Sequence, residues 1–237
     1  MAQSYFIWNG KDCRAMGITM RGPAAIIRPE ERVEHVEIPG RSGDVTETEG
    51  ENIYNSYIQT VSISVIGGRR LRDVYKWLRG SGYVTFSGEP DKRQKARIIG
   101  AITLNRISRN MDRWAGEVQF YCQPLKQLLH ETAEEFTASG AVILNSGDVE
   151  AKPRIRLTAS GTSATVAAGG KSLTVTGLTS GYVYIIDSET CTATNADGTV
   201  NMLHNTSGGF PVLAVGENTV TGSGWSKIEM QKRERYL

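Results

Sequence analysis

The stretch Tyr57–Ile66 reads Tyr-Ile-Gln-Thr-Val-Ser-Ile-Ser-Val-Ile and is followed by Gly67-Gly68. Within it, apolar side chains alternate with hydroxyl side chains, most regularly over Val61-Ser62-Ile63-Ser64-Val65. A period of two residues is typical of a β-strand that buries one face and exposes the other. The stretch therefore predicts a half-buried strand, and it sets the expectation of a β-rich first half.

Further short β-rich runs lie on both sides of this strand, and each stops at a glycine, a proline or a polar stretch. They are Tyr5–Trp8, Val33–Ile38, Gly82–Ser87, Ala96–Ile107 and Trp114–Cys122. The last two runs predict a hairpin with its tip near Arg109–Asp112, and Pro124 is expected to end the second run, because proline cannot donate to a strand ladder.

One segment has the helical period instead. Arg69–Arg79 places Leu71, Val74, Tyr75 and Leu78 at the spacing of a single helical face. So short a helix is marginal in isolation, so we expect it to pack on the sheet through these four side chains.

The second half of the chain has many short apolar runs separated by turn residues such as Ser160-Gly161 and Gly169-Gly170. This rhythm is typical of a β-sandwich or barrel. Basic side chains are in excess over residues 1–130 and acidic ones over residues 131–237, which supports a domain boundary there. We therefore expect a mostly β protein with two domains, 1–130 and 131–237.

Composition narrows the possible functions. The formal net charge of +2 gives no bulk attraction to nucleic acid, so no specific nucleic-acid partner is expected. No apolar run approaches the roughly 18–20 residues that span a bilayer, so no membrane insertion is expected. The start lacks the features of a signal peptide, which predicts folding in a reducing cytoplasm.

The motifs of common catalytic and cofactor sites are absent from the sequence. The three histidines, His35, His130 and His204, do not have metal-binding spacing, and there is no nucleophile elbow or phosphate loop. We therefore expect no enzyme activity, no catalytic residue, no cofactor and no metal site.

Several motifs, taken in order, resemble the distal tail protein (Dit) family of tailed bacteriophages. The motifs are Phe6-Ile7-Trp8-Asn9-Gly10, Met16-Gly17-Ile18, Val36-Glu37-Ile38-Pro39-Gly40-Arg41-Ser42-Gly43, Asn145-Ser146-Gly147, Tyr184-Ile185-Ile186-Asp187, Phe210-Pro211-Val212-Leu213 and Val215-Gly216-Glu217-Asn218. Together they cover nearly the whole chain, and their order and spacing carry the resemblance.

The resemblance implies a structural protein of the phage tail tip, a baseplate hub in the virion. An N-terminal ring-forming domain, β-sandwich-like with one packed helix and an extended hairpin arm, would assemble as a homo-hexamer. The ring would join the tail tube protein to a tail-associated fibre or lysin protein, with the tape measure and receptor-binding proteins as further partners. The C-terminal domain would be a galectin-like (jelly-roll) β-sandwich, with Asp187 as one of its structural residues.

The segment Ile38–Tyr57 is long, polar and punctuated by glycines, and loops of this length are usually functional or disordered. We expect it to form an arm that embraces a neighbouring copy, with a free surface loop as the alternative. The predicted subunit interface consists of Ile38, Pro39, Gly40, Arg41, Ser42 and Gly43.

Two other functions fit the sequence. One is a non-catalytic carbohydrate-binding module for adsorption to a cell envelope, in which Tyr182, Tyr184 and Trp225 would contact the sugar by stacking. Because Tyr182 and Tyr184 share one face of a strand, they could equally belong to the core or its rim. The other is an accessory domain of a cell-wall hydrolase.

Overall fold

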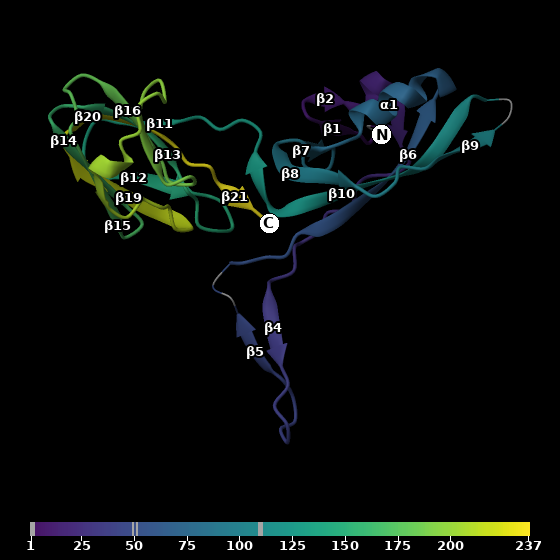
Figure 1. Ribbon diagram of the computed structural model, residues 1–237, viewed down its shortest axis with the longest axis horizontal. Helices are drawn as coiled ribbons and strands as arrows, with labels where there is room; N and C mark the ends of the chain where they lie inside the picture. Colours follow the sequence, from purple (N-terminus) through teal and green to yellow (C-terminus); the bar gives the residue numbers. More distant parts are fainter. Residues whose placement is uncertain (1–2, 49, 51, 109–110) are drawn as a thin grey trace. The chain divides into compact units, whose positions relative to one another are not determined.

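A computed structural model describes residues 3–48, 50, 52–108 and 111–237, and the chain forms two compact units (Figure 1). Unit 1 comprises residues 1–129 and Leu237, and unit 2 comprises residues 130–236. Strands dominate both units, and α1 (Leu71–Trp77) is the only α-helix among the described residues. The predicted mostly β class is confirmed.

Unit 1 is built on one antiparallel sheet with the strand order β2-β1-β7-β8-β10-β6-β3, and β9 also pairs with β10. The strands are β1 (Phe6–Trp8), β2 (Lys11–Asp12), β3 (Ile18–Met20), β6 (Tyr57–Ile66), β7 (Ser81–Phe86), β8 (Lys92–Ile99), β9 (Leu104–Ser108) and β10 (Arg113–Leu128). Two 3-10 helices accompany them, η1 (Cys13–Met16) and η2 (Gly68–Arg70). The predicted strand Tyr57–Ile66 is confirmed in full as β6, which pairs with β3 and β10.

The first hairpin of unit 1 depends on the turn Asn9-Gly10 between β1 and β2. Both residues have positive φ, 50° at Asn9 and 77° at Gly10, as a two-residue turn that matches the twist of its strands requires. The Asn9 side chain also accepts a hydrogen bond from the backbone N–H of Tyr83 at 3.0 Å. The turn is therefore fixed both by its own sequence and by the neighbouring strand β7.

The helix packs on the sheet through three of its four predicted side chains, Leu71, Val74 and Leu78. Val74 and Leu78 are buried as expected, but Tyr75 is 40% exposed. Trp77 packs against the core instead, and its ring stacks on Phe6 with centroids 5.8 Å apart. The prediction therefore failed only at Tyr75, and Trp77, the last residue of α1, makes an apolar contact that the sequence did not predict.

The long hairpin is more irregular than predicted. The expected strand 96–107 is interrupted after Ile99 at Gly100, which has φ of 71°. The partner strand β10 does not stop at Pro124 but continues to Leu128, with a register shift against β8 between Cys122 and Lys126. A bulge tolerates proline because the ladder is interrupted there. The predicted hairpin tip falls partly on residues 109–110, which lie outside the described residues.

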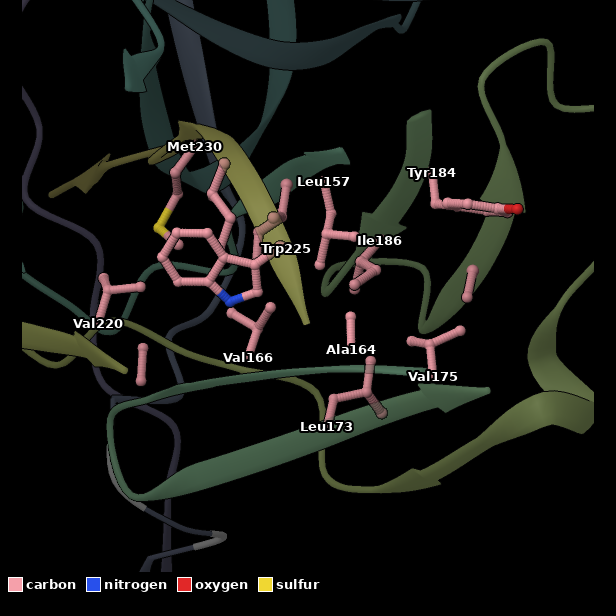
Figure 2. Close-up of a cluster of buried hydrophobic side chains, with 14 of the residues drawn as sticks. Leu157, Ala164, Val166, Leu173, Val175, Tyr184, Ile186, Val220, Trp225 and Met230 are labelled. Atoms are coloured by element: carbon pink, nitrogen blue, oxygen red, sulfur yellow. The ribbon is translucent and has the colours of Figure 1, made fainter. Parts of the chain in front are cut away.

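Unit 2 consists of two five-stranded antiparallel sheets, ordered β11-β20-β13-β16-β17 and β12-β19-β14-β15-β18. Their strands are β11 (Glu134–Phe136), β12 (Ala141–Asn145), β13 (Arg154–Ala159), β14 (Ser163–Ala168), β15 (Lys171–Thr176), β16 (Val183–Asp187), β17 (Thr192–Asn195), β18 (Thr206–Gly208), β19 (Gly216–Ser223) and β20 (Trp225–Gln231). The 3-10 helix η3 (Leu203–Asn205) and the short strand β21 (Arg235–Tyr236) belong to neither sheet. A single hydrophobic core takes side chains from both sheets, among them Leu157 and Ile186 from one and Val166 and Leu173 from the other (Figure 2). The sandwich architecture is confirmed, and the galectin-like assignment stays a prediction.

Two buried asparagines hold the loops of unit 2. The Asn145 amide donates to the carbonyls of Val149 at 3.1 Å and Leu213 at 3.0 Å. Asn218 does the same for the turn after Leu213, donating to Ala214 O at 2.8 Å and accepting from Ala214 N at 2.8 Å. Buried backbone groups need such partners, so these side chains account for two of the motifs quoted from the sequence.

Within the ranges the structure describes, no helix combines the length and the apolar character that a membrane crossing needs.

Candidate functional site

A hairpin arm in unit 1 is formed by β4 (Val33–Val36) and β5 (Val45–Thr48). The two strands are antiparallel, with Val36 opposite Val45 and Val33 opposite Thr48. They form a sheet of their own and pair with no other described strand (Figure 1). The arm therefore carries two open strand edges, whose free backbone groups can pair with another chain.

The tip of the arm contains all six residues of the predicted interface. Arg41 N donates to Ile38 O at 3.1 Å, which closes a turn with Pro39 and Gly40 at its centre. Gly40 has φ of 83°, and proline followed by a residue with positive φ is the signature of a type II turn. Gly43, with φ of 84°, makes a second bend, and Ser42 is exposed between the two. The sequence Pro-Gly-Arg-Ser-Gly therefore fixes the shape of the tip.

The tip encloses an open concavity of about 250 Å³, lined by Glu37, Ile38, Pro39, Arg41, Gly43 and Asp44. Its lining combines both signs of charge with an apolar wall. Such a surface is complementary to a polar peptide segment that carries one apolar side chain.

The arm has almost no buried side chain. Val36 is 38% exposed and Ile38 is 44% exposed, and all the described residues from Glu30 to Thr48 are exposed except Val33 and Val45, which are half-buried. A lone two-stranded hairpin is at best marginally stable in water. The apolar residues at the tip therefore have no core within their own unit, and covering them would stabilise the arm.

Charge placement also disfavours an isolated arm. Glu34 and Glu47 lie directly opposite each other on β4 and β5, and like charges at such positions destabilise a sheet. His35 opposes Thr46, and the His35 ring and the Thr46 hydroxyl are only 3.4 Å apart. A basic surface placed against the Glu34 face would remove the repulsion.

The arm begins earlier in the sequence than predicted. The sequence analysis took Val33–Ile38 as a strand and placed the arm after it, at Ile38–Tyr57. In the structure Val33–Val36 is itself one side of the arm, and its base is closed by a bridge between Glu31 and Tyr54. The only local signal for the second strand was the β-branched side chains of Val45, Thr46 and Thr48.

The three residues proposed for sugar contact do not share a surface. Tyr184 and Trp225 are each only 9% exposed and lie in the core of unit 2 (Figure 2). The Tyr184 hydroxyl accepts from Thr179 N at 2.9 Å, and the Trp225 indole donates to Thr165 O at 3.2 Å. Tyr182 alone is on the surface, 66% exposed. A stacking platform from these rings is therefore corrected to two core residues and one isolated surface ring.

Over the described part of the chain, no three side chains of His, Cys, Asp or Glu come together in a way that could hold a metal ion.

The sequence and the structure were compared with those of known proteins. No protein-family profile matches the sequence, and no curated protein matches it. Among solved structures, the Dit protein of phage SPP1, described as a paradigm of the hub adsorption apparatus in phages that infect Gram-positive bacteria, matches with a TM-score of 0.81 and 18% identity. The match covers 100% of both chains.

Two structures of the phage P2 baseplate in its activated conformation match more distantly. The one with Ca has a TM-score of 0.55 at 9% identity and covers 100% of this chain and 99% of the other. The one with Sr has a TM-score of 0.54 at 9% identity and covers 97% of each. From its first strand to its last, this chain therefore has the fold of the phage Dit proteins, as the motifs in its sequence predicted.

Proposed function

We propose that this protein is a structural, non-enzymatic hub of a phage tail tip. Six copies form a ring through residues 1–130, and the ring joins the tail tube to the fibre or lysin protein and to the receptor-binding machinery. The C-terminal sandwich is a peripheral platform of this hub. The protein is made in the host cytoplasm and acts in the virion.

One observation carries the proposal, the hairpin arm, which has no partner within its own unit. A closed ring uses heterologous contacts, in which one patch of each copy meets a different patch of the next. An arm with open edges, an apolar tip at Ile38 and an unfavourable Glu34–Glu47 pair fits the donor side of such a contact. The full-length likeness to SPP1 Dit supports the same function.

The proposal is tested by measuring the mass of the purified full chain across concentrations, by light scattering after gel filtration, with negative-stain images of the same fractions. We expect particles of about six subunits that appear as rings. The variant Ile38→Asp places a charge at the apolar tip and should shift the protein towards monomer without lowering its thermal stability, because the side chain is already exposed.

The matched control is Val215→Asp, which changes a side chain of similar exposure, 57%, in unit 2. It should assemble as the wild type does. Rings that form equally well with Ile38→Asp would contradict the role of the arm. A wild-type protein that stays monomeric at every concentration would contradict a self-assembling ring.

The carbohydrate-binding alternative has less support, because two of its three proposed contact residues are core residues. It is decided by a glycan array probed with the full chain. Binding that survives Tyr182→Ala would have to use a different surface from the one predicted.

A further inference from the structure

The first sheet of unit 2 has an open cavity of about 400 Å³ on its outer face. It is lined by Ala133, Arg154, Arg156, Ile185, Ala196, Glu229 and Gln231. Arg154 and Arg156 are two residues apart on β13, so both side chains point to the same face of the sheet. The proposed ring, which forms through residues 1–130, does not use this cavity.

The guanidinium of Arg154 makes no hydrogen bond or ion pair with any described residue, and Arg154 is exposed. Its cross-strand neighbour Asp187 makes no ion pair with it, and both oxygens of that carboxylate are bound by Arg233 at 2.7 and 2.9 Å. Its other neighbour is Gln231, which is uncharged. Arg154 therefore presents its full set of donors to the cavity.

The second arginine is only weakly engaged. Arg156 lies 3.4 Å from Glu229 and its side chain is 54% exposed. The other oxygen of Glu229 is bound more closely by Lys227, at 2.8 Å. Lys227 and Arg156 therefore share one carboxylate, and most of the Arg156 donors remain free.

We propose that this cavity binds an oxyanion, a phosphate or carboxylate group, between Arg154 and Arg156. A guanidinium recognises either group through two parallel N–H donors, and the Gln231 side chain next to Arg154 supplies amide donors. Ile185 adds an apolar side chain to the lining, and Ala133 and Ala196 add small ones. Among the residues that line the cavity, two arginines face one carboxylate, Glu229, and the nearby Asp187 is held by Arg233.

The lining favours an oxyanion over an uncharged sugar. None of the seven lining residues is aromatic, so the stacking surface that a neutral pyranose commonly uses is missing. Charge-assisted hydrogen bonds are the strong interactions that the cavity can offer.

The test is calorimetric titration of the full chain, at low ionic strength, with two probes, sodium tripolyphosphate for the phosphate class and sodium citrate for the carboxylate class. We expect saturable binding of at least one probe, which identifies the class, and weaker binding as salt is added. Arg154→Gln should weaken binding about tenfold, the effect of losing one charge-assisted contact. Arg154→Lys should weaken binding less than Arg154→Gln, because lysine keeps the positive charge although it lacks the two parallel N–H donors of the guanidinium.

The matched control is Arg72→Gln, which removes an exposed arginine from α1 in unit 1 and should leave the affinity unchanged. Thermal melting checks that each variant is folded, and no loss of stability is expected because Arg154 is exposed and unpaired. Two outcomes would overturn the proposal: neither probe binds, or Arg154→Gln and Arg72→Gln weaken binding to the same extent.

Discussion

Arg233 holds Asp187 at the end of β16 with a bidentate contact, Nη1 to Oδ1 at 2.7 Å and Nη2 to Oδ2 at 2.9 Å. The backbone of Arg233 has φ of 56°, a conformation that residues other than glycine rarely adopt. Asp187 also accepts from the backbone N–H of Glu189 at 3.0 Å and Thr190 at 3.3 Å. A single carboxylate thus orders the β16–β17 turn and attaches the C-terminal segment of unit 2, the structural role that the family resemblance implied.

The first prediction concerns the pH dependence of this contact. Partial burial alone would raise the pKa of Asp187, but the hydrogen bonds and charge of Arg233 outweigh it and hold that pKa below its usual value of 3.8. Because the folded-state pKa is lowered, the stabilisation is present above the unfolded pKa and is lost as the pH falls through the folded one. Asp187→Asn should destabilise the protein by about 1–3 kcal/mol at pH 7.

Urea denaturation at pH 7 and at pH values below 4 checks this. The difference between Asp187→Asn and wild type should shrink at the lower pH, where the wild-type carboxylate also becomes protonated. The control Asp44→Asn removes an exposed carboxylate at the arm tip and should be nearly neutral at both pH values. An equal loss of stability at both pH values for Asp187→Asn would contradict the ionic role of the contact.

The second prediction concerns the packing of α1. Trp77 stacks on Phe6, whereas Tyr75, two residues earlier in α1, is 40% exposed. We expect Trp77→Ala to lower the free energy of unfolding by about 2–4 kcal/mol, somewhat less than for a fully buried tryptophan. Tyr75→Ala should change it by less than about 0.5 kcal/mol. Chemical denaturation of the two variants decides the order, and a larger loss for Tyr75→Ala would restore the face predicted from the sequence.

The third prediction concerns the arm. Its backbone hydrogen bonds are exposed to solvent and supported by almost no buried side chain, so local opening should cost little. Amides of β4 and β5 should exchange rapidly in monomeric fractions and become protected in ring fractions, as followed by hydrogen exchange and mass spectrometry. The amides of Ile63–Val65 in β6 serve as an internal reference, since this part of the strand is paired on both sides. Equal exchange of the arm in both fractions would show that the arm is not covered in the ring.

The fourth prediction concerns the three thiols. Burial raises the pKa of Cys122 to about 12, and burial also raises the pKa of Cys13, whereas Cys191 is exposed. Because the thiolate is the reactive form, a thiol reagent at neutral pH should label Cys191 alone in the folded protein. Peptide mapping identifies the labelled site, and all three cysteines should react in denaturant. Rapid labelling of Cys13 or Cys122 in the folded protein would contradict the burial described for unit 1.

The strand positions could be predicted from the sequence wherever alternation was regular. Tyr57–Ile66 was predicted correctly because the side-chain period of a strand is local and needs no knowledge of the fold. The turn residues were equally informative, since Asn9-Gly10 and Pro39-Gly40 adopt backbone angles that few other pairs allow. The interruption at Gly100 and the bulge at Pro124 were missed because a partner strand decides whether a ladder continues.

The sequence by itself determined the β class, most strand positions and the turn at the arm tip, since these depend on the periodicity and backbone preferences of neighbouring residues. Only the tertiary structure decided that Tyr184 and Trp225 are core residues, that Trp77 replaces Tyr75 against the sheet, and that Val33–Val36 belongs to the arm. Alternation tells which side chains share a face, but a face is buried only when another element covers it, and that element comes from distant parts of the chain. The contacts of Arg154 were also decided by the tertiary structure. Its cross-strand neighbour Asp187 is bound by Arg233, a residue far from both in the sequence.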